Sequence, residues 1–191
     1  MNLPNKLTLM RIILTPIFMA VLYWGFPGAD YAALAIFIIA SLTDLLDGKI
    51  ARKYNLVTDF GKFADPLADK ILVTAAMLWF VEVGRMPAWA LLVVLLREFA
   101  VSGLRMIASD KGRVIAAGWS GKVKTAATMV CIIVMLLLGP ETARAASHSL
   151  TAVPVGWLGW IDPVCVWVIV LTTLYSGIEY FVKNRDVIAS A

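Results

Sequence analysis

Long apolar stretches are the feature that most constrains the fold of this chain. Runs of mostly apolar residues follow one another along nearly the whole sequence, each close to the ~20 residues that a helix needs to cross a bilayer. The composition agrees, because 61% of the 191 residues are hydrophobic and 16% are charged, whereas soluble domains are nearer half apolar and a quarter charged. We therefore predict an integral membrane protein in which residues 1–191 form a single membrane domain.

Turn residues divide the apolar sequence into six expected helices of an all-α, polytopic fold. The first run is expected to be a span rather than a cleaved signal, because Arg11 lies within it and no A-x-A site ends it. A longer connection between the last two helices contains Trp157 and Trp160, and Trp favours membrane interfaces. The predicted helices cover residues 7–25, 31–53, 58–83, 88–109, 118–138 and 162–182.

The basic residues are distributed unevenly between the two sides of such a domain. With six spans, 12 of the 17 Lys and Arg residues fall on the side of both termini, 2 fall on the other side and 3 lie within spans. Lys and Arg gather on the cytoplasmic side of membrane proteins. We therefore expect a multi-pass protein of the inner (cytoplasmic) membrane, with both termini and the acidic segment on the cytoplasmic side.

An acidic segment, DLLDGKIARKYNLVTDFGKFADPLADK, separates two apolar runs and begins at Asp44. Asp44 and Asp47 are three residues apart at the end of one expected helix, and Asp65 and Asp69 are four apart near the start of the next, so each pair shares a helix face. Unpaired, the four carboxylates would cost several kcal/mol in a poorly hydrated site. Divalent cations relieve that cost, and carboxylate oxygens suit Mg²⁺ or Mn²⁺. Asp59, by contrast, is expected to favour the dipole of a helix N-terminus.

The residues beside the aspartates fit phosphate chemistry. Gly48 and Ala51 are small and lie on the side of the first acidic pair, so a ligand can approach the backbone there. Arg52 can hold a phosphate through a fork of hydrogen bonds. Two metals can bridge a phosphodiester, and an aspartate at their edge can take the proton of an incoming hydroxyl. The alternative, solvated carboxylates that only cap helix ends, is disfavoured by the spacing.

These residues form a complete sequence signature. It reads Asp44-x2-Asp47-Gly48-x2-Ala51-Arg52-x8-Gly61-x3-Asp65-x3-Asp69. The pattern resembles the signature of the CDP-alcohol phosphatidyltransferase family, whose members transfer a substituted phosphate from a CDP-linked donor to an alcohol and release CMP. The resemblance covers essentially the whole chain. It implies six transmembrane helices around a polar cavity open to the cytoplasm, and usually a homodimer.

The resemblance also implies roles for individual positions. Two divalent cations, Mg²⁺ or Mn²⁺, would be held by Asp44, Asp47, Asp65 and Asp69, and Asp69 would be the general base. Two roles are open for residues at the start of the first helix, capping of that helix or contact with the nucleotide. The implied CDP-binding residues are Asp47, Gly48, Ala51, Arg52 and Gly61, together with Asn5 and Thr8.

Basic motifs elsewhere bear on the acceptor alcohol. A charge within a span needs a partner or a wet cavity, so Glu98 is expected to pair with a neighbouring cation. An acceptor that carries its own phosphate, such as glycerol 3-phosphate, fits a patch of cations better than an uncharged alcohol. The same motifs are similar to those of bacterial family members that make phosphatidylglycerophosphate and CMP from CDP-diacylglycerol and glycerol 3-phosphate. The expected acceptor-phosphate-binding residues are Arg97, Arg105, Lys122, Lys124 and Thr125.

Other interpretations of these features remain. The cations could serve only to anchor the protein against anionic lipid headgroups. Within the family, inositol phosphate, serine or a second phosphatidylglycerol could be the acceptor. A protein of another class, a membrane cation transporter, also places carboxylates in membrane helices, although the acidic cluster lies at one edge of the expected spans. Cys131 and Cys165 are interpreted as small core residues, and His148 is given no chemistry.

Overall fold

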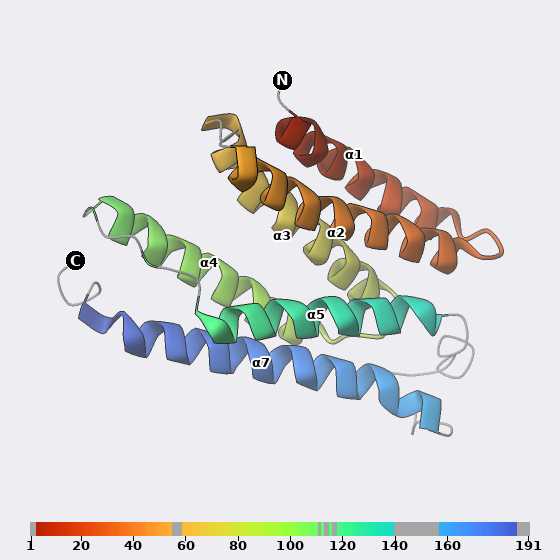
Figure 1. The fold of residues 1–191 in the computed structure, drawn as a ribbon. Coiled ribbons are helices and arrows are strands. Elements are labelled where there is room, and N and C mark those ends of the chain that lie inside the picture. Colours follow the sequence, from red (N-terminus) through yellow and green to blue (C-terminus); the bar gives the residue numbers. More distant parts are fainter. Residues whose placement is uncertain are drawn as a thin grey trace.

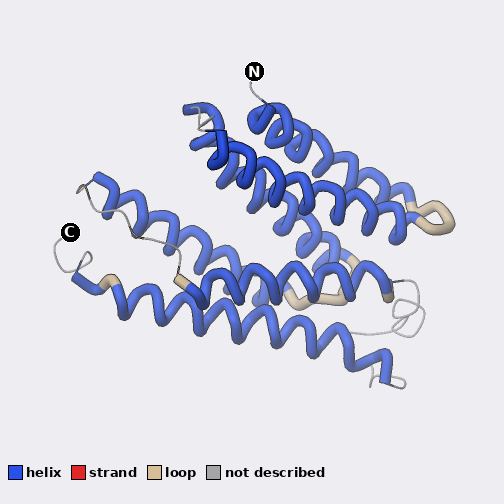
Figure 2. Tube along the Cα trace, in the orientation of Figure 1, coloured by secondary structure: helices blue, strands red, loops and turns tan. Residues whose placement is uncertain are grey.

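The described part of the chain consists of α-helices, one short 3-10 helix and the turns between them. The computed structural model describes residues 3–54, 59–110, 112, 115, 118–139 and 157–186, and their side chains except at 3–4, 44–54, 59–66, 69, 110 and 157–158. Within these ranges there is no strand, which confirms the all-α prediction (Figure 2). The elements are α1 (Leu3–Trp24), α2 (Ala29–Tyr54), α3 (Asp59–Glu82), α4 (Ala88–Asp110), α5 (Trp119–Leu137), the short 3-10 helix η1 (Trp157–Trp160) and α7 (Ile161–Lys183).

The helix ends agree with the predicted ends to within two residues, except at the start of the chain. Helix α1 begins at Leu3, four residues before the predicted start, and so includes Pro4. A proline is tolerated in the first turn of a helix, where its missing N–H has no partner to lose. Residue 58, where the third helix was expected to begin, and most of the connection before the last helix lie outside the described residues.

The helices run alternately up and down, so that the described chain has two distinct ends (Figure 1). The start of α1, the end of α7 and the facing ends of α2 and α3 and of α4 and α5 lie at one end, which we call the terminal end (Figure 1). The α1–α2 and α3–α4 turns lie at the other, which we call the turn end. Helix α1 packs against α2 and α3, α5 packs against α2 and α7, and α4 packs against α3 and α7. The α1–α2 turn is tight because Gly25 and Gly28 adopt φ values of 64° and 90°, which glycine reaches without steric cost.

Three of the described helices are long and apolar enough to cross a membrane: Asn5–Trp24, Trp119–Leu137 and Ile161–Lys183. Helices α2, α3 and α4 carry more charge within their length, because they contain the acidic segment and the basic residues near it. Large apolar side chains also point away from the bundle, as at Phe99, which is 68% exposed. Such an outward apolar surface suits lipid rather than water, so the chain is an integral membrane protein.

The interior of the bundle changes character halfway along the helices. Toward the turn end, the core contains Phe18, Phe37 and Phe80, all fully buried. From the middle of the helices toward the terminal end, the same inward faces bury hydroxyl, amide and charged groups. The buried polar side chains are Asn5, Thr8, Arg11, Thr15, Lys124, Thr128, Thr173 and Ser176.

Candidate active site

The first acidic pair continues a stripe of buried residues on α2. Ala33, Phe37 and Ala40 are each fully buried, and they recur at alternating spacings of four and three residues. Asp44 and Asp47 are the next two positions of that series, within the same helix. Positions at this spacing share one helix face, so both aspartates lie on the face of α2 that points into the bundle.

The second acidic pair occupies the matching position on α3. Leu72 and Ala76 are buried, and Asp65 and Asp69 precede them at the same heptad spacing in the helix. Here the stripe is polar at the terminal end and apolar at the turn end. By helical register, the four aspartate positions continue two buried stripes, one on α2 and one on α3.

Helix α1 lies against both acidic helices, and its packing face is polar where the aspartates are. Asn5, Thr8, Arg11 and Thr15 recur along one side of α1, and Arg11 is only 1% exposed. The Thr15 hydroxyl donates to the carbonyl oxygen of Arg11, at 3.0 Å. Since α1 packs against α2 and α3, this stripe brings a buried guanidinium to the helices that carry four carboxylates.

The donor set of the acidic helices fits divalent cations. Four aspartates at helical spacing on α2 and α3 are residues of the type that offers the hard oxygen ligands that Mg²⁺ and Mn²⁺ prefer. Among the side chains that the structure describes, no other group of three His, Cys, Asp or Glu residues is placed to hold a metal ion. The donor chemistry that fits such ions is thus that of the aspartates on α2 and α3.

A cluster of charged side chains, which we call the Glu98 cluster, joins three helices near the middle of the bundle. The Glu98 Oε1 atom accepts hydrogen bonds from Lys124 Nζ of α5 at 2.6 Å and from Arg97 Nη1 of α4 at 3.0 Å. The Lys70 Nζ atom of α3 lies 3.9 Å from Glu98 Oε2. The Lys124 side chain is 7% exposed and that of Glu98 is 20% exposed. One carboxylate thus pairs with three cations, each in a different part of the sequence.

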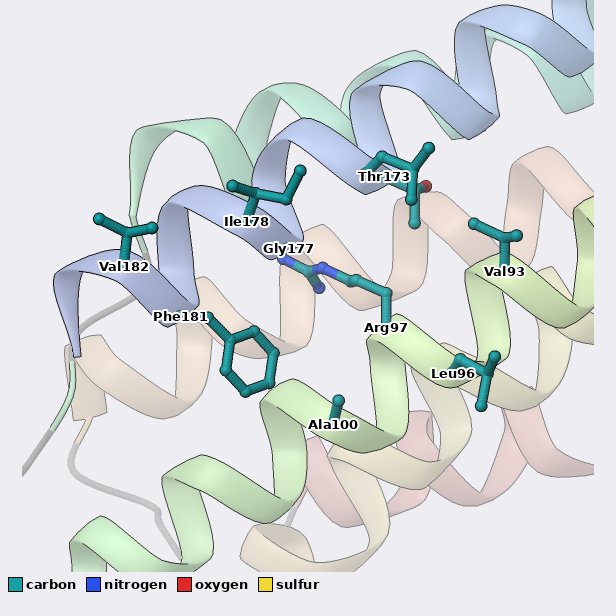
Figure 3. A pocket seen from close by; sticks show the side chains of 10 residues that line it. Val93, Leu96, Arg97, Ala100, Thr173, Gly177, Ile178, Phe181 and Val182 are labelled. Carbon is teal, nitrogen blue, oxygen red and sulfur yellow. The ribbon is translucent and has the colours of Figure 1, made fainter. Parts of the chain in front are cut away.

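Two serines complete the contacts of the Glu98 cluster. Lys70 Nζ donates to Ser102 Oγ, one turn from Glu98 on α4. Arg97 Nη2 donates to Ser176 Oγ on α7 at 2.6 Å. The arginine reaches α7 because that helix has a glycine there (Figure 3): a Cβ atom on Gly177 would lie 3.1 Å from Arg97 Cγ. The cluster therefore connects α3, α4, α5 and α7.

A groove of about 500 Å³ lies between α4 and α7, beside the Glu98 cluster. Arg97 crosses it from α4 toward Gly177, while Phe181 and Ile178 line it from α7 (Figure 3). Apart from Arg97 and Thr173, its lining residues are apolar or glycine. Such walls suit a hydrocarbon chain and not a nucleotide.

The structure divides the predicted acceptor residues into two groups. Arg97 and Lys124 meet through Glu98, which confirms that Glu98 pairs with neighbouring cations. Arg105 is exposed; its Nε donates to the Tyr180 hydroxyl at 3.1 Å and its guanidinium lies 5.6 Å from the Tyr180 ring centre. The other two, Lys122 and Thr125, are exposed on α5.

Several predicted residues have side chains that the structure does not describe. They are Asp44, Asp47, Gly48, Ala51, Arg52, Gly61, Asp65 and Asp69. Their places in α2 and α3 are nonetheless given, so the site can be located on the two helices and in depth.

Sequence analysis missed the part of Lys70 in this site. It was not among the expected acceptor-binding residues, yet it donates a hydrogen bond to Ser102 and pairs with Glu98. The spacing of Glu98 and Ser102 could have indicated this contact, because residues four apart share a face of α4. That face is where a cation from a neighbouring span would be expected.

The turn end holds a separate ion pair. Arg85, in the α3–α4 turn, donates from Nε and Nη2 to the two carboxylate oxygens of Asp162 at 2.8 and 2.7 Å. Its guanidinium also lies 5.3 Å from the ring centre of Phe80. Two parallel hydrogen bonds between planar groups give a strong, directional pair. This pair fastens the start of α7 to the α3–α4 turn, far from the acidic pairs along the helices.

Comparison with known proteins identifies the family. Residues 1–175 match the description CDP-alcohol phosphatidyltransferase. A Bacillus subtilis protein named CDP-diacylglycerol–glycerol-3-phosphate 3-phosphatidyltransferase is 43% identical over 100% of this chain and 98% of its own length. A Rickettsia bellii protein of the same name is 34% identical over 94% of this chain and 93% of its own. A Mycobacterium tuberculosis protein named probable phosphatidylglycerophosphate synthase is 35% identical over 97% of this chain and 83% of its own. The chain belongs to the CDP-alcohol phosphatidyltransferase family.

Proposed function

We propose that this protein transfers the phosphatidyl group of CDP-diacylglycerol to glycerol 3-phosphate, giving phosphatidylglycerophosphate and CMP. The observation that carries the proposal is the 43% identity to the Bacillus subtilis enzyme of that name, which extends over the full length of both chains. The complete acidic signature supports the transfer chemistry. The cations of the Glu98 cluster support an acceptor that bears a phosphate.

Enzymes of this family generally depend on a metal ion. Asp44, Asp47, Asp65 and Asp69 would hold two divalent cations, Mg²⁺ or Mn²⁺, on the inward faces of α2 and α3. When bound, such ions neutralise charge on the pyrophosphate and on the departing CMP. Magnesium suits carboxylate and phosphate oxygens together, which fits a site built to receive a nucleotide diphosphate.

The proposed chemical step is an in-line substitution at phosphorus. Asp69 accepts the proton of the C1 hydroxyl of glycerol 3-phosphate. The freed oxygen forms a bond to the phosphorus that carries diacylglycerol, and the bond from that phosphorus to the CMP oxygen breaks. Holding both reactants in this geometry lowers the barrier by removing the entropy cost of their encounter. The residues proposed to bind the CDP group are Asp47, Gly48, Ala51, Arg52 and Gly61, with Asn5 and Thr8.

The acceptor phosphate is proposed to lie against the basic residues of the terminal half. Arg97 and Lys124 are held in place by Glu98. Arg105 and Lys122 are exposed nearer the terminal end, where positive charge raises the local concentration of an anion, and Thr125 is exposed next to Lys124. Glycerol 3-phosphate would pass the exposed group first and then reach the buried one.

The finer topology belongs to the same proposal. We expect six spans, with both termini and the site on the cytoplasmic side of the inner membrane, and a homodimer. CDP-diacylglycerol would enter sideways with its acyl chains left in the bilayer. A cysteine-accessibility scan of intact cells, with single cysteines placed at Lys6 and Trp24, would test the orientation: labelling of position 6 from outside the cell would contradict it.

Product identification tests the function. Purified protein in detergent is given CDP-diacylglycerol, Mg²⁺ and one acceptor at a time: glycerol 3-phosphate, inositol phosphate, serine or phosphatidylglycerol. Mass spectrometry should find phosphatidylglycerophosphate and an equal amount of CMP with the first acceptor. A lipid product only with another acceptor would keep the family chemistry and overturn the acceptor assignment. Cation uptake into liposomes without any CMP release would favour a transporter.

A further inference from the structure

Among the side chains that the structure describes, the charges of the Glu98 cluster do not balance. Lys70, Arg97 and Lys124 bring three positive charges to a site where one carboxylate accepts them, so the described members carry a net charge of +2. The side chains of Lys124 and Arg97 are 7% and 13% exposed, and an uncompensated charge in a membrane helix is costly. A further anion that pairs with the cations would remove this cost.

Hydrogen-bond donors are also in surplus. An ammonium has three donors and a guanidinium has five. Lys124 donates to Glu98, and Arg97 donates to Glu98 and Ser176, while Arg97 Nε is buried without a hydrogen-bond partner among the described residues. Unused donors beside unbalanced positive charge suit a group with several acceptor oxygens and more than one negative charge. A phosphate monoester is such a group.

The cluster lies at the depth of the proposed general base. Lys70 directly follows Asp69 in α3, and one residue advances a helix by only about 1.5 Å. The two positions differ by about 100° around the helix axis, so they point to neighbouring sides of α3. Lys70 meets Glu98 and Ser102 of α4 on its side. An anion held at the cluster would therefore be close to the reacting hydroxyl in depth.

We propose that Glu98 is a positioning residue for the acceptor: it holds Lys124 and Arg97 so that their remaining donors bind the phosphate of glycerol 3-phosphate. Its single negative charge lets three cations share a small space, and still leaves the positive charge that attracts a doubly charged phosphate. Glu98 itself is negative and does not touch the acceptor; it acts through Lys124. This inference rests on the proposed function, because it takes the acceptor from it.

The test separates the Michaelis constants of the two substrates. E98Q keeps the size of the side chain and removes its charge, so the three cations repel and lose their fixed positions. We expect the KM for glycerol 3-phosphate to rise about tenfold, with the KM for CDP-diacylglycerol unchanged within about twofold. K124A should show a similar rise. The double variant E98Q/K124A should be no worse than K124A in this respect, because both changes remove the same interaction.

Two further variants keep the test decisive. E98D preserves the charge and should retain most of the affinity for glycerol 3-phosphate; if E98Q does not fold, a small rise of the same KM in E98D is the expected result. E179Q removes a carboxylate that pairs with Lys183 at the exposed end of α7, and should leave both KM values unchanged. This control shows what loss of an ion pair does away from the cluster.

Four results would overturn the proposal. In three of them E98Q changes the kinetics: a lower KM for glycerol 3-phosphate, an equal rise in both KM values, or effects of E98Q and K124A that multiply. The fourth is an E98Q variant with unaltered KM values. The first would mean that Glu98 competes with the acceptor, and the second and third that it acts on folding or elsewhere. Failure of the proposed function is distinguishable, because wild-type protein would then release no CMP with glycerol 3-phosphate. If the wild type is active and E98Q has unaltered KM values, the inference about Glu98 is wrong and the proposed function stands.

Discussion

The two halves of the helix bundle bury opposite kinds of side chain on the same helix faces. In the turn half, Phe18, Phe37 and Phe80 are fully buried, and the Arg85–Asp162 pair fastens the helix ends. In the terminal half, the corresponding faces hold the acidic pairs and the Glu98 cluster. Close packing of apolar groups stabilises a fold, whereas buried charges cost free energy unless paired.

This difference assigns separate tasks to the two halves. Packing in the turn half holds the helices together, so that the terminal half can bring together charges that would otherwise repel. Substitutions in the turn half should lower stability and leave substrate dependence alone. Substitutions in the terminal half should change catalysis or substrate dependence in protein that still folds.

The largest effect is expected at Asp69. D69N removes the proposed base while keeping nearly the same size, so kcat should fall about 1000-fold, as measured by CMP release. Thermal unfolding in detergent should change little, because the amide can occupy the same space. Wild-type activity in this variant would remove Asp69 from the base role.

The next largest effect is a loss of stability in the turn half. F80A leaves a cavity in the core and should lower the free energy of unfolding by about 3 kcal/mol, measured by denaturant or thermal unfolding. F99A is the matched control, because Phe99 is 68% exposed; its effect should stay within about 0.5 kcal/mol. Equal losses from the two variants would contradict a packed core in this half.

The ion pair between Arg85 and Asp162 at the turn end should contribute less to the free energy of unfolding than Phe80 does. R85A leaves the Asp162 carboxylate without its arginine partner in a partly buried site. The free energy of unfolding should fall by about 2 kcal/mol, and neither KM should change. K183A breaks the exposed pair with Glu179 and should cause no measurable loss, since exposed pairs are weak. A changed KM in R85A would show that the turn end is coupled to the site.

The smallest expected effect is a difference in the KM for glycerol 3-phosphate between variants at two lysines of α5. K124A should raise the KM for glycerol 3-phosphate about tenfold, because Lys124 is buried in the Glu98 cluster. K122A removes an exposed charge two residues earlier in α5 and should raise the same KM about twofold, by weaker attraction of the anion. A larger effect at position 122 would place the acceptor on the exposed group instead.

Much of this fold could be predicted from the sequence, because the signals are local. Apolar runs ended by Gly and Pro define the helices. The predicted start of α1 was four residues late, because Pro4 lies within the first turn of the helix, where a proline is tolerated. The acidic pairs are also local, since a spacing of three or four residues fixes a shared face. Their complete signature carried the family resemblance, which the match over residues 1–175 confirms.

The Glu98 cluster could be predicted only in part, because it depends on tertiary packing. Lys70, Glu98 and Lys124 come from three helices, and no spacing within one helix says which helices meet. The path of Arg97 to Ser176 requires a glycine at position 177 on a different helix. The sequence says that a buried charge needs a partner; only the packing of α3, α4, α5 and α7 says which.

One comparison of acceptors tests the central claim most directly, namely that the polar half recognises the acceptor by its phosphate. CMP release by purified protein is measured with CDP-diacylglycerol and Mg²⁺, using glycerol 3-phosphate in one series and glycerol at equal concentrations in the other. The account predicts release with glycerol 3-phosphate and almost none with glycerol. Equal rates with the two acceptors, or no release with either from folded protein, would contradict it.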